Sequence, residues 1–122
     1  SIYFKCDCIN KNNSYINIVI IDTFMTTNEI RTYRLIIKGK VQGVGFRHWF
    51  SDLAISLGLN GYVQNKESKD EVEAIIQGDM QSILSITEKA KIGPEMALVE
   101  GVIPSSIISN VKYSGFIVKY EN

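Results

Sequence analysis

Residues 32–65 read TYRLIIKGKVQGVGFRHWFSDLAISLGLNGYVQN, and this stretch decides the fold. It begins with Thr32 to Val41, which is rich in aliphatic and aromatic side chains and predicts a strand. A loop with two close glycines, Gly43 and Gly45, follows the strand. Apolar residues then recur at the spacing of one helical face, which predicts a helix with a single apolar stripe of Phe46, Trp49, Phe50, Leu53, Ala54 and Leu57.

Turn-forming residues divide the chain beyond this helix. Gly58 stands where the helix is expected to end, and Gly61 to Asn65 predicts a second strand. A polar turn is expected at Lys66 to Asp70. Apolar and polar residues then alternate, which predicts a half-buried third strand with Val72, Ala74 and Ile76 on one face and Glu71, Glu73 and Gln77 on the other.

A second helix is expected after Asp79, whose side chain can cap the first turn. Gly93 and Pro94 mark its end. Its apolar face is predicted to consist of Met80, Ile83, Leu84 and Ala90. Two last strands are predicted at Met96 to Val102 and Gly115 to Tyr120.

The predicted order of elements is β-α-β-β-α-β, with one additional short strand. This order predicts an α+β protein with a ferredoxin-like βαββαβ sandwich, in which two helices cover one face of an antiparallel sheet. The same fold supports many functions, so it does not identify one by itself.

The composition of the chain changes near residue 28. Residues 1–24 are crowded with Ile, Asn, Lys, Tyr and Phe and contain neither Gly nor Pro. We favour the interpretation that an upstream AT-rich stretch is translated here and that Met25 is the natural start. The alternative is that Ile16 to Ile21 forms an accessory strand. The expected organisation is an N-terminal extension at 1–28 followed by one domain at 29–122.

Charge and cysteine content exclude several classes of function. The 13 Lys and Arg balance the 13 Asp and Glu, which argues against broad nucleic-acid or membrane-surface binding. Cys6 and Cys8 are too close for a comfortable disulfide and too few for a structural zinc site. The apolar run at Ile16 to Ile21 is too short to span a bilayer. We expect a cytoplasmic protein, a monomer, that needs no metal or other cofactor.

The loop between the first strand and the first helix has the features of an anion site. A glycine-bearing turn lets successive N–H groups point into one concavity, and a helix N-terminus carries unpartnered N–H groups. An arginine there adds a planar fork of donors suited to phosphate. The predicted phosphate-binding loop is Gln42, Gly43, Val44, Gly45, Phe46 and Arg47. On these residues alone, a plain turn explains the glycines about as well as an anion site does.

Longer motifs extend this pattern. The first is Gly39-x-Val41-Gln42-Gly43-Val44-x-Phe46-Arg47, and a second follows at Gly61-Tyr62-Val63-Gln64-Asn65. Two shorter motifs follow downstream, Gly93-Pro94-x-x-Ala97-x-Val99 and Gly115-Phe116-Ile117-Val118. Over about residues 31–120 the sequence resembles the acylphosphatase family. The hairpin after Asn65 departs from the family pattern, because Lys66 to Glu71 contains no glycine.

The resemblance implies an enzyme that hydrolyses the carboxyl–phosphate bond of acyl phosphates without a metal. Arg47 and the amides of the loop would bind the phosphoryl group, and Asn65 would hold the attacking water. Inorganic phosphate would be both product and inhibitor. His48 lies off the apolar stripe and is expected to face solvent rather than act as a base.

Two other functions are compatible with this fold. One is a non-catalytic module that binds a phosphoryl or carbamoyl-phosphate group within a larger maturation system. The enzyme is favoured over it because the sequence shows no additional domain. The other is an RNA-binding domain, which would need paired aromatic and basic residues on its central strands. Gly61-Tyr62-Val63 does not supply that pattern, and the charge balance is wrong for it.

Overall fold

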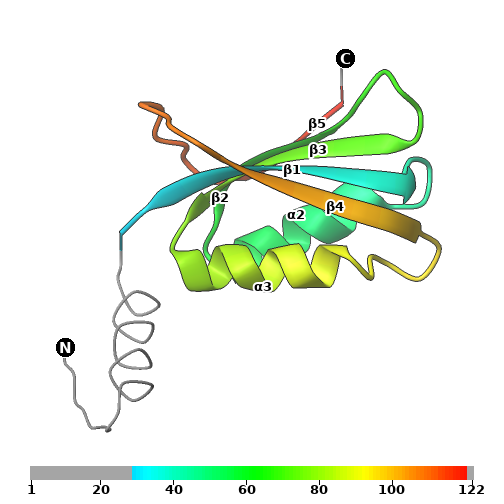
Figure 1. Cartoon of the computed structure of the whole chain (residues 1–122), viewed down its shortest axis with the longest axis horizontal. Helices are drawn as coiled ribbons and strands as arrows, with labels where there is room; N and C mark the ends of the chain where they lie inside the picture. Colours follow the sequence, from blue (N-terminus) through cyan, green and yellow to red (C-terminus); the bar gives the residue numbers. More distant parts are fainter. Residues whose placement is uncertain (1–28, 121–122) are drawn as a thin grey trace, which may run out of the picture.

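Residues 29–120 are described by a computed structural model, in which two helices cover one face of a five-stranded sheet (Figure 1). The strands and helices are β1 (Arg31–Lys40), α2 (Phe46–Ser56), β2 (Asn60–Asn65), β3 (Glu71–Gly78), α3 (Met80–Ala90), β4 (Leu98–Ile107) and β5 (Phe116–Lys119). The predicted extension at 1–28, with its alternative accessory strand and both cysteines, lies outside the described residues.

The order of strands in the sheet is β4-β1-β3-β2-β5. Pairs β1–β3, β1–β4 and β2–β3 are antiparallel, as expected of a ferredoxin-like βαββαβ sandwich, so the predicted fold is confirmed. The additional short strand, β5, pairs with β2 in parallel, a direction that the sequence did not predict. β4 is also longer than predicted, because the strand continues through Pro104 to Ile107.

The core lies between the sheet and the two helices. From α2 it takes Phe46, Phe50 and Ala54, which belong to the predicted apolar stripe. Around them lie fully buried aliphatic side chains from the sheet and α3: Leu35, Ile37, Val63, Val72, Ala74, Ile76, Ile83 and Ile86. At about 1.5–3 kcal/mol for each large apolar side chain, this burial is the main term that stabilises the sandwich.

The prediction of which residues form the apolar face of α3 was partly wrong. Leu84 is 39 % exposed, whereas Ile86 and Thr87 are buried. Thr87 tolerates burial because its hydroxyl donates to the Ile83 carbonyl one turn back, at 2.7 Å. The predicted cap of this helix is confirmed, since the Asp79 carboxylate accepts a hydrogen bond from the Ser82 N–H at 2.9 Å.

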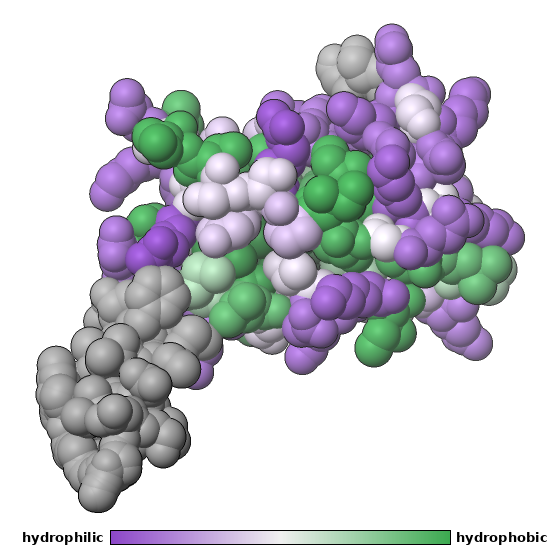
Figure 2. All heavy atoms as spheres, in the orientation of Figure 1, coloured by the Kyte–Doolittle hydropathy of each residue, from purple (hydrophilic) through white to green (hydrophobic). Residues whose placement is uncertain are grey.

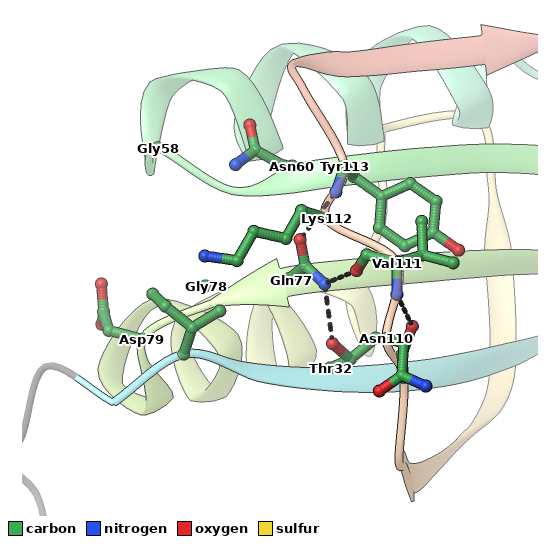
Figure 3. Close-up of a pocket in the computed structure, with 12 residues that line it drawn as sticks. Thr32, Gly58, Asn60, Gln77, Gly78, Asp79, Asn110, Val111, Lys112 and Tyr113 are labelled. Carbon is green, nitrogen blue, oxygen red and sulfur yellow. Dashed lines mark hydrogen bonds between the residues drawn. The ribbon is translucent and has the colours of Figure 1, made fainter.

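Gln77 does not face solvent as the alternation of β3 predicted; it is only 6 % exposed. The segment from β4 to β5 crosses the end of the sheet and covers it (Figure 3). The Gln77 amide donates to Thr32 Oγ1 and to the Val111 carbonyl, and its Oε1 accepts from the Tyr113 N–H. A cavity of about 490 Å³ opens here, at the end of the sheet away from the predicted phosphate loop. Both the NH₂ and the oxygen of the Gln77 side chain are thus already bonded to the protein.

The remaining surface of the sheet and helices is mixed. In Figure 2 apolar side chains reach the surface as separate patches between hydrophilic ones. On the sheet face away from the helices, Arg34 pairs with Glu73 and Lys38 with Glu71, at 3.1 and 3.4 Å. Within residues 29–120, no helix is long and apolar enough to cross a membrane.

Candidate active site

The loop after β1 has the backbone conformation of an anion-binding concavity. Gly43 and Gly45 have φ angles of 72° and 79°, in the left-handed region. A Cβ added at either glycine would meet nothing within 4 Å. Backbone conformation rather than crowding therefore explains the glycines at these two positions. Left-handed residues between ordinary ones turn successive N–H groups toward the same side of the chain.

These N–H groups have no partners in the described part of the chain. From Gln42 to His48 no backbone N–H donates a hydrogen bond, and the first to do so is that of Trp49, to the Gly45 carbonyl at 3.1 Å. The N-terminus of α2 has no capping side chain and no acidic residue in its first turn. By contrast, Asp79 occupies the N-terminus of α3. The first turn of α2 thus presents a run of donors and the positive end of a helix dipole to an external anion.

Arg47 lies in the first turn of α2 and is partly buried. One of its terminal nitrogens, Nη1, donates to the Lys119 carbonyl at 2.9 Å. Its guanidinium carbon lies 4.8 Å from the centre of the Tyr120 ring. Among residues 29–120, the other guanidinium N–H groups make no hydrogen bond or ion pair. Arg47 is therefore anchored through one nitrogen, and its other N–H groups have no partner among the described residues.

Asn65 ends β2 and carries a side-chain oxygen without a partner. Its Oδ1 is buried and accepts no hydrogen bond from any of residues 29–120. An orphaned buried acceptor costs about 1–3 kcal/mol, which a bound water could recover by donating to it. A cavity of about 300 Å³ adjoins this residue and is also lined by Lys66 and Glu73.

Pairing between β2 and β5 brings Asn65 to the side of the molecule where Arg47 is anchored. Gln64 is in register with Lys119, and Asn65 follows directly. Since Arg47 bonds to the Lys119 carbonyl, the two predicted catalytic residues are connected through a single pair of strand residues. The structure thus brings together the first turn of α2, the end of β2 and the end of β5.

Gln42 connects the loop to the hairpin that follows Asn65. Its side-chain amide donates to three backbone carbonyls, those of Lys66, Ser68 and Glu71, at 2.9, 3.1 and 2.8 Å. The hairpin turn contains no glycine, and an additional bond from the Lys66 N–H to the Glu71 carbonyl closes it. The side chain of Gln42 thus stabilises the turn, and its backbone N–H remains part of the concavity.

Two residues at the chain end were not predicted as part of the site. Lys119 supplies the carbonyl that anchors Arg47, and Tyr120 supplies the ring beneath it. The Lys119 ammonium also lies 3.7 Å from the centre of the Tyr62 ring. Burial raises the pKa of the Tyr62 hydroxyl, and the charge of Glu73 raises it further. No local pattern indicates these contacts, because they depend on the pairing of distant strands.

His48 is exposed, as predicted, and bonds to Tyr120 through Nε2 at 2.7 Å. Within residues 29–120, no three His, Cys, Asp or Glu side chains are grouped as ligands for a metal ion.

The family model and the curated relatives that match this chain all belong to one family. The Acylphosphatase family model matches residues 33–118. A curated acylphosphatase of Dehalococcoides mccartyi is 42% identical over 87 residues, which is 71% of this chain and 96% of the relative. Another, of Caldivirga maquilingensis, is 38% identical over 88 residues, which is 72% of this chain and 93% of the relative.

Solved structures agree with these matches. An acylphosphatase from Coxiella burnetii has a TM-score of 0.71 and 35% identity, with 78% of this chain and all of that chain covered (100%). Full-length HypF, in a phosphate- and nucleotide-bound form, has a TM-score of 0.69 at 22% identity, which shows the fold alone. The similar region covers 76% of this chain but only 12% of HypF.

Proposed function

The chain belongs to the acylphosphatase family, whose members hydrolyse acyl phosphates, and from that premise we propose how its residues carry out the reaction. The loop amides from Gln42 to Arg47, together with the Arg47 guanidinium, bind the phosphoryl oxygens. The side-chain amide of Asn65 holds the attacking water. The substrate is a small acyl phosphate, and the products are a carboxylate and inorganic phosphate.

In this mechanism the water attacks phosphorus in line with the leaving carboxylate. A bond forms between the water oxygen and phosphorus, and the bond from phosphorus to the carboxylate oxygen breaks with its electron pair going to the carboxylate. The water gives up one proton, which passes to an oxygen of the phosphoryl group or to solvent. A carboxylate is a stable anion, so the reaction needs no general acid at the leaving oxygen. The protein's task is to position the reactants and to stabilise charge on the equatorial oxygens.

The observation that carries the proposal is the run of N–H groups from Gln42 to His48, which have no partner among residues 29–120 and lie at a helix N-terminus without a capping side chain. Together with the free donors of Arg47, these groups supply positive potential to a phosphoryl group without a metal ion. Asn65 Oδ1 supports the second role, because it is an acceptor that needs a donor.

Further parts of the proposal concern the protein as a whole. Inorganic phosphate, which the same donors bind, acts as a competitive inhibitor. The enzyme works as a monomer and needs no metal. A cytoplasmic location, which the close pair Cys6 and Cys8 suggests, belongs to the same proposal.

The alternative, a module that binds the phosphoryl group without hydrolysing it, retains the loop but predicts no turnover. A purified preparation should hydrolyse an aryl acyl phosphate such as benzoyl phosphate, both with and without a strong chelator. An alkyl phosphate ester is the matched control, because its alkoxide leaves poorly without a general acid and should not be cleaved. Absence of turnover with retained phosphate binding would favour the module. Turnover lost to the chelator and restored by magnesium would contradict the metal-free mechanism.

A further inference from the structure

Two side chains of the first turn of α2, Arg47 and His48, meet the side chain of Tyr120, which follows β5. Tyr120 Oη lies 2.7 Å from His48 Nε2, and their ring centres are 5.9 Å apart. The same Tyr120 ring lies beneath the guanidinium of Arg47, with 4.8 Å from the guanidinium carbon to the ring centre. One tyrosine therefore contacts two consecutive residues of α2 in different ways.

Arg47 needs such a support because few contacts hold it. The only hydrogen bond of its side chain within residues 29–120 is the one to the Lys119 carbonyl, and a single hydrogen bond leaves the guanidinium free to rotate about it. A face-on contact with an aromatic ring fixes the plane of the guanidinium, which decides where its free N–H groups point. The Tyr120 ring thus fixes the one orientation that the hydrogen bond leaves open.

The ring of Tyr120 in turn needs a contact that fixes its orientation. It follows β5, which ends at Lys119, and it is 62 % exposed, so packing restrains its ring only weakly. Its hydroxyl has one partner among the described residues, the imidazole of His48. Because His48 lies on the first turn of a helix whose core side is packed, it offers a fixed point for a side chain at the chain end.

We propose that His48 is a positioning residue for Arg47, acting through Tyr120: His48 holds the tyrosine hydroxyl, and the tyrosine ring holds the plane of the guanidinium. The proposal rests on the phosphoryl-binding role of Arg47 proposed above. His48 takes no part in proton transfer in this arrangement, since its bonded nitrogen is engaged by Tyr120.

The bond does not depend on one form of the imidazole. With a bare Nε2 the tyrosine O–H donates to it, and with a protonated Nε2 the N–H donates to Tyr120 Oη. A glutamine at position 48 has similar reach and also carries both a donor and an acceptor. His48→Gln should therefore preserve the arrangement, whereas His48→Ala should abolish it.

The test compares His48→Ala, Tyr120→Phe and the double variant with the unchanged protein. Measured quantities are kcat and KM for benzoyl phosphate, the inhibition constant of inorganic phosphate, and Tm. Each single variant should weaken phosphate inhibition and kcat/KM by roughly threefold to tenfold, the effect of one hydrogen bond. The double variant should be no worse than either single one, because both remove the same bond. Tm should stay nearly constant, because the pair lies at the surface.

Two further variants sharpen the test. His48→Gln should restore kcat/KM to within about twofold of the unchanged protein, since it keeps the bond. Tyr113→Phe removes a tyrosine hydroxyl at the opposite end of the sheet and should change nothing. Additive losses in the double variant, a loss that glutamine does not rescue, or a loss that follows Tm would each overturn the positioning role.

Arg47→Lys, measured in parallel, separates this proposal from the one on which it rests. An inactive Arg47→Lys beside a fully active His48→Ala overturns the role of His48 and leaves the proposed function standing. An active Arg47→Lys overturns both.

Discussion

Arg47 Nη1 donates a hydrogen bond of 2.9 Å to the backbone carbonyl of Lys119, although the two residues are 72 positions apart in the sequence. Lys119 is paired with Gln64, which directly precedes Asn65. The end of β5 therefore lies beside the candidate site, because it connects the first turn of α2 to the end of β2. Changes in β5 should influence catalysis even though the strand carries neither predicted catalytic residue.

Replacement of Arg47 is the most direct test of the phosphoryl-binding role. Arg47→Lys keeps the charge but loses the planar fork, so the lysine should not restore normal activity. Loss of a donor of this kind costs on the order of 3–4 kcal/mol in the transition state, a few hundredfold or more in turnover. Competitive inhibition by inorganic phosphate should disappear as well. Tm should change little, because the core side of α2 keeps its contacts.

The matched control is Arg34→Lys, on the sheet face away from the helices. Arg34 pairs with Glu73 at the surface, and a lysine keeps that attraction, so hydrolysis should be normal. A well-folded Arg47→Lys protein with near-normal turnover would contradict the proposed site.

Asn65→Ala should separate water positioning from phosphate binding. Turnover should fall heavily, whereas the inhibition constant of phosphate should stay nearly the same, because Asn65 holds water rather than the phosphoryl group. Stability should not decrease, since the substitution removes an unpartnered buried acceptor, Oδ1. Kinetics and thermal melting of the same preparation measure all three effects. The exposed Asn110→Ala serves as control, and equal losses of turnover and phosphate binding would assign Asn65 to the concavity.

We expect the Gln42 side chain to stabilise the hairpin turn that follows Asn65. Gln42→Glu replaces the donating NH₂ with an oxygen that faces three backbone carbonyls. We expect a loss of about 1–3 kcal/mol in the free energy of unfolding, more than that of Gln42→Ala, because repulsion adds to the lost bonds. Turnover should fall in both variants, since Asn65 directly precedes this turn. Gln81→Glu, on the exposed side of α3, is the matched control for urea unfolding. An unchanged unfolding midpoint in Gln42→Glu would show that the three contacts do not matter.

The sequence predicted the elements of this fold well because the periodic signals are local. The stripe from Phe46 to Leu57, the cap at Asp79 and the stops at Gly58 and Gly93 each depend on neighbours within a turn or two. Predictions failed where distant segments decide burial. Gln77 is polar and alternates with the apolar face of β3, yet the segment around Val111 covers it. Leu84 is apolar, yet it is 39 % exposed, whereas Ile86 on the same helix is fully buried.

In the candidate site, too, local motifs predicted some residues, whereas contacts between distant segments could not be predicted. Arg47 and Asn65 were predicted from motifs on separate elements, and the pairing of β2 with β5 connects these elements through Lys119. That Lys119 and Tyr120 belong beside Arg47 could not be read from the sequence, because β5 joins β2 in parallel across a long connection. Nor could the three bonds of the Gln42 side chain, which depend on how closely the loop approaches the turn at Lys66.

Removal of residues 1–24 tests whether the domain begins where the composition changes. A chain that starts at Met25 should unfold at the same urea midpoint and keep its kcat/KM for benzoyl phosphate. The reason is that the buried apolar residues of the described range run from Leu35 to Phe116, and that β1 begins at Arg31. A chain that starts at Ile36 is the matched control. It lacks the part of β1 that pairs with Ala74 to Gly78, so it should not fold cooperatively. A lowered midpoint in the Met25 chain would instead assign residues 1–24 to the folded domain and favour an accessory strand at Ile16 to Ile21.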